Sequence, residues 1–121
     1  MKTKSIKVYG PEDEQFIANL RSIGVDRKVA SVLAYFRNEE KATSRSIEMA
    51  SGLRQPEVSL AIRQLRKRGW IATLPTASKG RRMQDEYSLA GVTVKDIVNH
   101  FWADIQKSMD EKAKLYQQLT E

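Results

Sequence analysis

The chain has 121 residues, no cysteine and a formal net charge of +6. This length suits one domain with one core, so we treat residues 1–121 as a single unit. The composition argues against disulfide frameworks and thiolate chemistry, no apolar stretch approaches the roughly 20 residues that cross a bilayer, and the N-terminus lacks the apolar run of a signal peptide. We therefore expect a cytoplasmic protein that needs no membrane and no cofactor.

The excess positive charge is concentrated in one quarter of the sequence. Residues 54–82 contain eight Lys or Arg and a single acid, Glu57, so this segment carries +7 while the rest of the chain carries −1. Such a concentration is typical of a surface that binds a polyanion. The alternative interpretation is a solvated charged face.

Two amphipathic helices are predicted in the N-terminal third. Pro11 followed by three acids suits the first turn of a helix, and an apolar stripe continues this helix over about residues 11–23. Asp26 is a suitable N-cap for a second helix, whose apolar residues recur at helical spacing. Both helices are expected to build the core.

A short helix, a glycine turn and a longer helix follow. Thr43 or Ser44 caps the short helix, and Gly52 ends it because glycine accepts the left-handed conformation found at helix ends. Pro56 suits the first position of the longer helix, which is predicted to run to Gly69. Two helices joined by such a turn form the helix-turn-helix pattern.

The longer helix has two chemically different faces. At about 100° per residue its apolar positions fall within one arc, the predicted core face: Val58, Ala61, Ile62 and Leu65. The opposite side carries Pro56, Ser59, Leu60, Arg63, Gln64 and Lys67. Arg63 can make a bidentate contact to guanine, and Gln55 or Gln64 can pair with adenine. The alternative is that these side chains only solubilise the helix.

The segment after Gly69 predicts a β-hairpin. Its apolar flanks, "WIATL" and "YSL", enclose a polar loop in which Gly80 lies among three cations, Lys79, Arg81 and Arg82. If the preceding helix occupied a major groove, this loop would lie beside a phosphate or a minor groove.

The run from "SRSIEMASGLRQPEVSLAIRQLRKRGWI" through "SKGRRMQDEYSLAG" resembles the winged helix-turn-helix of MarR-, ArsR- and TrmB-like bacterial and archaeal regulators, over about residues 26–90. The resemblance implies a mainly α fold with a small β-hairpin, and binding of a dimer to double-stranded DNA with a wing beside the site. The residues predicted to bind DNA are Ser44, Arg54, Gln55, Pro56, Ser59, Leu60, Arg63, Gln64, Lys67, Lys79, Arg81 and Arg82.

A long C-terminal helix is predicted over about residues 94–119, which contain neither Gly nor Pro. Apolar residues repeat along it at intervals of four and three and form a seam with one flaw, Lys112: Val98, Trp102, Ile105, Met109, Tyr116 and Leu119. A second line, Val94, Ile97 and Phe101, is expected to pack on the helix's own domain, which leaves the seam as a dimer interface. The alternative is a monomer in which this helix folds back along the first helix.

His100 has Asp96 and Asp104 about one turn away on the same helix, which permits a metal site, although a surface charge partner is the commoner role. No spacing matches a catalytic template, so a binding protein is expected rather than an enzyme. The leading hypothesis is a homodimeric transcriptional regulator without an indicated small-molecule effector. The alternatives are a winged-helix module that docks an acidic protein of the transcription machinery, and an RNA-binding winged helix.

Overall fold

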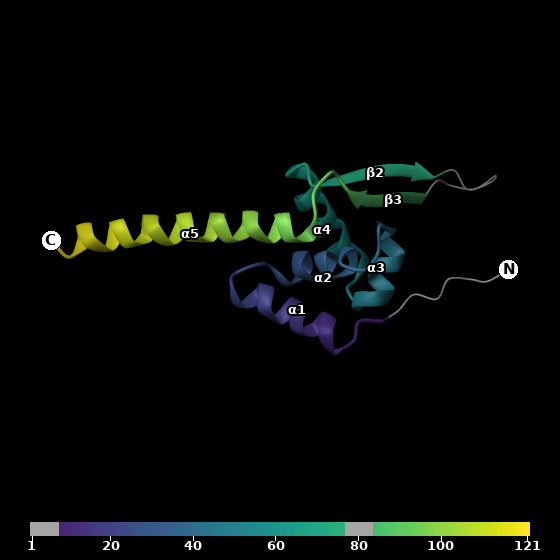
Figure 1. Cartoon of the computed structure of the whole chain (residues 1–121), viewed down its shortest axis with the longest axis horizontal. Coiled ribbons are helices and arrows are strands. Elements are labelled where there is room, and N and C mark those ends of the chain that lie inside the picture. The colour runs from purple at the N-terminus through teal and green to yellow at the C-terminus, as the bar shows by residue number, and fades with distance from the viewer. Residues whose placement is uncertain (1–7, 77–83) are drawn as a thin grey trace.

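The computed structural model describes residues 8–76 and 84–121, which form five helices and three short strands (Figure 1). In chain order the elements are α1 (Pro11–Ser22), α2 (Arg27–Phe36), β1 (Lys41–Ala42), α3 (Ser44–Ser51), α4 (Gln55–Lys67), β2 (Ile71–Thr76), β3 (Gln84–Leu89) and α5 (Val94–Leu119). The protein is therefore mainly helical with a small sheet, as predicted. None of the described helices is long and apolar enough to span a membrane.

Helix α2 is the centre of the core. Asp26 is its N-cap, as predicted, and seven of its ten residues are buried. It contacts α1, α3, α4 and β1, so the other elements are assembled around it. A helix buried on most sides must be apolar around most of its circumference, which the sequence "KVASVLAYF" satisfies with small and branched side chains.

The residues before α1 are fastened to this core through Tyr9, for which the sequence suggested no role. Its backbone N–H donates to the carbonyl oxygen of Ala50 at 3.1 Å, and its hydroxyl donates to the carbonyl oxygen of Ser31 at 2.5 Å. Burial raises the pKa of the Tyr9 hydroxyl, and the nearby charge of Asp13 raises it further. The hydroxyl therefore stays protonated at neutral pH and keeps its role as a donor.

Helices α3 and α4 are joined by the predicted glycine turn. Thr43 caps α3, since its Oγ1 accepts from the backbone N–H of Ser46 at 3.0 Å while Ser46 Oγ accepts from the N–H of Thr43 at 2.9 Å. Gly52 ends α3 with a left-handed φ of +78°. Helix α4 begins one residue before Pro56 rather than at it, and proline suits both positions because the first turn of a helix leaves its N–H groups unpaired.

Strands β2 and β3 form the predicted hairpin, with Ile71 opposite Leu89, while residues 77–83 that connect them lie outside the described residues. A third strand, β1, was not predicted. It pairs with β3, Ala42 lying opposite Tyr87, so the antiparallel strand order is β1-β3-β2. A strand of two residues is too short to show an alternating pattern, and the preceding "RNEEK" indicated only the end of α2.

Helix α5 has the predicted bounds and is attached to the domain by its first turns. Ile97 is fully buried in the core, and Thr93 caps the helix by accepting from the N–H of Asp96 at 3.1 Å. Beyond these turns the helix projects from the domain as a single rod (Figure 1), and residues 106–121 are all exposed. This part of α5 is therefore not packed along α1, as the fold-back alternative would require.

The left-handed turn at Gly52 provides a test of the helix-turn-helix geometry. A Cβ added there meets no atom within 4 Å, so any cost of Gly52→Ala arises from the backbone conformation alone. We expect Gly52→Ala to lower the free energy of unfolding by about 1 kcal/mol in urea denaturation. Gly52→Asn should cost less, because asparagine tolerates this conformation better. Equal losses for both variants would contradict this account.

Candidate nucleic-acid interface

Helix α4 presents one face to the core and the opposite face to solvent. Its predicted core residues are all buried where α4 meets α2 and α3: Val58, Ala61, Ile62 and Leu65. The other side, which we call the outer face, is formed by Gln55, Pro56, Ser59, Leu60, Arg63, Gln64 and Lys67. Ser59 is half-buried and the others are exposed, including Leu60 with 43% of its surface accessible.

Two polar side chains of the outer face are linked to each other. Gln55 Nε2 donates to Ser59 Oγ at 2.9 Å, across one turn of α4. The amide oxygen of Gln55 and the hydroxyl hydrogen of Ser59 then remain available to an external partner. The pair therefore offers an acceptor and a donor, already oriented, near the start of the helix.

Glu57, the single acid of residues 54–82, accepts a hydrogen bond at the start of α4. Glu57 Oε1 accepts from the backbone N–H of Arg54 at 2.9 Å, and Glu57 Oε2 lies 3.9 Å from Arg27 Nη1. A carboxylate in the first turn also interacts favourably with the positive end of the helix dipole. The negative charge is thus engaged at the helix start, while the cations farther along the outer face, Arg63 and Lys67, remain exposed.

The remaining predicted DNA-binding residues lie at two places or fall outside the described residues. Ser44 is the half-buried first residue of α3, and Arg54 is the exposed N-cap of α4. The predicted loop cations, Lys79, Arg81 and Arg82, lie outside the described residues.

Arg68 fastens the end of α4 to α5, a role that the sequence did not reveal. Its Nη2 lies 2.8 Å from Asp104 Oδ2, and its guanidinium carbon is 4.8 Å from the ring centre of Trp70 and 5.4 Å from that of Phe101. The Trp70 and Phe101 rings also meet edge to face at 5.3 Å. Arginine can pair and stack at once because its guanidinium is planar. We call these four residues the α4–α5 joint.

The chain was compared with known proteins. No protein-family model and no curated protein sequence matches it. The three-dimensional structure does match solved structures. TrmBL2, an archaeal chromatin protein with a novel mode of DNA binding, gives a TM-score of 0.62 at 16% identity, with 88% of this chain and 38% of that chain covered. A possible transcriptional regulator from Methanosarcina mazei Go1 gives 0.57 at 16% identity, covering 88% of this chain and 85% of that chain.

The fold is a winged helix-turn-helix. A MarR-family transcriptional regulator from Silicibacter pomeroyi also shares it, with a TM-score of 0.53, 16% identity, and 82% of this chain and 67% of that chain covered. The fold that the sequence resemblance implied is therefore confirmed. In this winged helix, α3 and α4 are the two helices of the helix-turn-helix, and β2 and β3 are the strands of the wing.

The predicted seam of α5 separates into two parts in the winged-helix structure. Val98 was assigned to a second subunit, yet it packs against the core of its own chain. Ile105 is half-buried and lies beside Gly24: a Cβ at Gly24 would be 3.6 Å from Ile105 Cδ1. The rest of the seam is exposed: Trp102, Met109, Tyr116 and Leu119. The dimer interface stays a prediction.

His100 and the two acids beside it, Asp96 and Asp104, all contact other residues of the same chain. The ring centre of His100 lies 5.5 Å from that of Trp70, and Asp104 pairs with Arg68. Hydrogen bonds from the backbone N–H and side chain of Thr93 hold the pKa of Asp96 below its usual value. The described residues contain no group of three metal-ligating side chains.

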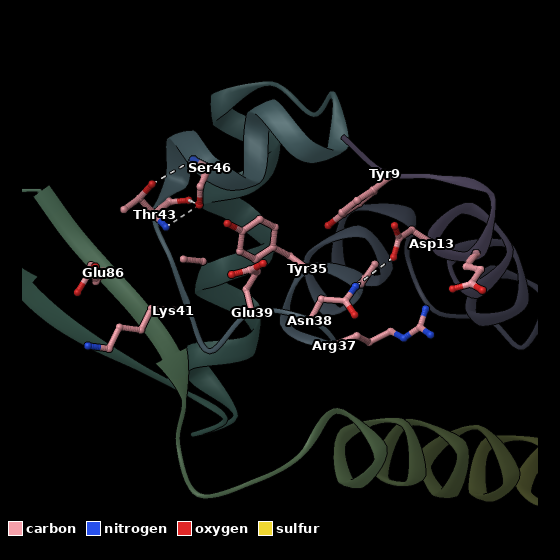
Figure 2. A pocket seen from close by; sticks show the side chains of 13 residues that line it. Tyr9, Asp13, Tyr35, Arg37, Asn38, Glu39, Lys41, Thr43, Ser46 and Glu86 are labelled. Carbon is pink, nitrogen blue, oxygen red and sulfur yellow. Dashed lines mark hydrogen bonds between the residues drawn. The ribbon is translucent and has the colours of Figure 1, made fainter. Parts of the chain in front are cut away.

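A polar cavity of about 680 Å³ lies between α1, α2, β1 and the start of α3 (Figure 2), and no residue of the outer face lines it. Asn38 Nδ2 donates to Asp13 Oδ1 at 3.5 Å on one side, and the Thr43–Ser46 cap lies on the other. Its lining includes acids and bases together: Glu12, Asp13, Glu39, Glu86, Arg37 and Lys41. Acids outnumber bases among these lining residues, so the cavity is poorly suited to a polyanion.

Two substitutions of Glu57 separate the effect of its hydrogen bond at the start of α4 from the effect of its charge. Glu57→Ala removes the acceptor for the N–H of Arg54 and should lower the free energy of unfolding by roughly 0.3–1.5 kcal/mol. Glu57→Gln keeps an acceptor oxygen and should retain most of this stability, because the exposed contact with Arg27 at 3.9 Å contributes little. Urea denaturation of both variants is the measurement. If Glu57→Gln lost as much as Glu57→Ala, the charge and not the hydrogen bond would be stabilising α4.

Proposed function

We propose that this chain is a sequence-specific regulator that binds double-stranded DNA as a homodimer, with α4 in the major groove. The outer face of α4 is the observation that carries the proposal. It combines exposed cations and amides with one exposed leucine, and it contains no acid among its described residues. The solved structures of the same fold support the proposal, since they are described as a DNA-binding chromatin protein and as transcriptional regulators.

The side chains of the outer face match the chemistry of base edges. The major groove is about 12 Å wide and admits one helix. Arg63 has the planar fork that pairs with guanine O6 and N7, and Gln64 has the amide that pairs with adenine N6 and N7. Leu60 suits the methyl group of thymine. The bond between Gln55 and Ser59 reduces the conformational entropy that these side chains would lose on binding.

Contacts to the DNA backbone are assigned to cations around this face. Lys67 and Arg54 lie towards opposite ends of α4, where they can reach phosphates. The loop cations Lys79, Arg81 and Arg82 are proposed from the sequence to contact the flanking backbone or minor groove. Phosphate contacts release counterions, so affinity should fall steeply as salt concentration rises.

The homodimer is proposed from the exposed part of the α5 seam. Tyr116 and Leu119 are 67% and 83% accessible on a helix that projects from the domain. Two copies related by a two-fold axis would present two α4 helices to the half-sites of a palindrome. Selection of bound sequences from a random duplex pool should therefore enrich a palindrome. Enrichment of a single half-site would contradict dimeric binding.

Arg63 is the residue whose replacement best tests base reading. Arg63→Ala should weaken binding to the selected site by about 1–3 kcal/mol and binding to scrambled DNA far less, because a bidentate contact to a base edge is lost. Lys107→Ala is the matched control, since it removes one positive charge from an exposed position on α5, away from the outer face. Fluorescence anisotropy titrations at several salt concentrations measure both effects.

Equal losses on both sequences for Arg63→Ala would show that α4 anchors the protein without reading bases. Arg81→Ala should differ from Arg63→Ala by weakening both sequences alike and lowering the salt slope by about one unit. If the unmodified chain did not bind duplex DNA even at low salt, the DNA-binding proposal would fail and docking of an acidic protein or of RNA would replace it.

A further inference from the structure

A second cavity, of about 510 Å³, lies where α5 leaves the domain. Its walls come from the α1–α2 turn, the start of α2, the end of α4 and about the third turn of α5, and we call it the α5 cavity. Its apolar lining is Val25, Val29, Leu65, Phe101 and Ile105, and its charged and polar lining is Asp26, Gln64, Lys67, Arg68 and Asp104. The cavity therefore combines apolar side chains with two cations and two acids, of which Arg68 and Asp104 pair with each other.

Four of the nine exposed large apolar side chains among the described residues lie on residues 106–121, which we call the α5 tail. Leu115, Tyr116 and Leu119 are 58%, 67% and 83% accessible. The α5 tail cannot fold into the α5 cavity of its own chain, because α5 is one continuous helix through Ile105 and Leu119. At about 1.5 Å per residue these two positions are roughly 21 Å apart. The apolar lining residues of the cavity and the exposed apolar side chains of the tail thus remain separate within one chain.

We propose that the α5 tail of a second copy covers the α5 cavity in an antiparallel α5–α5 pair, so that each copy supplies one tail and one cavity. This inference rests on the proposed homodimer and specifies its arrangement. The spacing of the seam fixes the register. Trp102 lies opposite the partner's Leu119, Ile105 opposite the partner's Tyr116, and Met109 opposite the partner's Lys112.

Lys112 decides the direction of the pair. In a parallel pair each Lys112 would face the same residue of the partner within the seam, which places two like charges together. In the antiparallel pair Lys112 faces Met109 of the partner, and its flexible stem can carry the ammonium group to water. The seam's flanking positions offer no charge that would enforce a parallel register: Gln106, Ser108, Ala113, Leu115 and Thr120.

The charges at the two ends of the contact are complementary. Helix α5 ends at Leu119, so its C-terminal carbonyls carry the negative end of the helix dipole, and Glu121 adds an acid there. The antiparallel register brings this end towards the α5 cavity, where Lys67 carries a positive charge, whereas Arg68 is already paired with Asp104. A parallel pair would leave the negative end of the tail far from Lys67.

The absence of cysteine from the sequence makes disulfide formation a clean test. The two full-length variants Trp102→Cys and Leu119→Cys, mixed and oxidised mildly, should give a mixed disulfide dimer. Each variant alone should not crosslink, because the two copies of position 119 lie about 25 Å apart in this register, whereas a disulfide requires Cα atoms within about 7 Å. Ile105→Cys mixed with Tyr116→Cys provides a second pair, and Lys107→Cys on the outward side is the control.

The outcomes separate the arrangement from the dimer itself. Sedimentation of the unmodified chain as a monomer at all concentrations would overturn both the proposed homodimer and this inference. A dimer in which Leu119→Cys crosslinks to itself would be parallel and would overturn the arrangement alone. A dimer in which neither mixed pair crosslinks would also overturn it.

Replacement of Leu119 tests whether the end of the tail contributes to the contact. Leu119→Asp should raise the dimer dissociation constant at least about tenfold in sedimentation equilibrium, because a charge replaces an apolar side chain against the partner's Trp102. Gln118→Asp places the same charge at the same helix end but on the outward side, and it should change the constant less than about twofold. Equal effects of the two variants would overturn the assignment of Leu119 to the contact.

Discussion

The division of α4 into a buried and an exposed face is the constraint on which the rest of this structure depends. Val58 and Leu65 are locked into the core beside α2, so they fix the rotation of the helix about its axis. That rotation determines which side chains face solvent, and it places Arg63 and Gln64 on the outer face. The same packing that stabilises the domain therefore orients the surface proposed to read DNA, because close-packed side chains leave little freedom to rotate the helix.

The α4–α5 joint connects this surface to the part of the chain proposed to dimerise. Arg68 and Asp104 hold the end of α4 against α5, while Ile97 fixes the start of α5 in the core. A helix held at both points moves with the domain as one rigid element. In a dimer built on α5, the separation of two α4 helices would then follow from the register of α5, and so would the spacing of two half-sites.

Several acids of the chain form hydrogen bonds at helix starts or an ion pair between helices. Their negative charge is therefore used away from the outer face of α4. Glu57 and Asp96 each accept a backbone N–H at a helix start, and Asp104 pairs with Arg68. Each interaction neutralises or engages a carboxylate within one turn of a helix or at the α4–α5 joint. The outer face of α4 itself contains cations and no acid among the described residues, which is the electrostatic condition for attracting a polyanion.

The sequence by itself determined the helices, the glycine turn and the two faces of α4, because caps and apolar periodicity act over three or four residues. It also determined the bounds of α5. Only the tertiary structure revealed β1, the anchoring of Tyr9 on Ser31, the packing of Val98 on its own core and the role of Arg68, since each of these joins segments far apart along the chain. The α5 cavity likewise exists only where three separate elements meet. Local interactions leave a readable spacing in the sequence, whereas the partner of a distant contact is decided by how the helices pack.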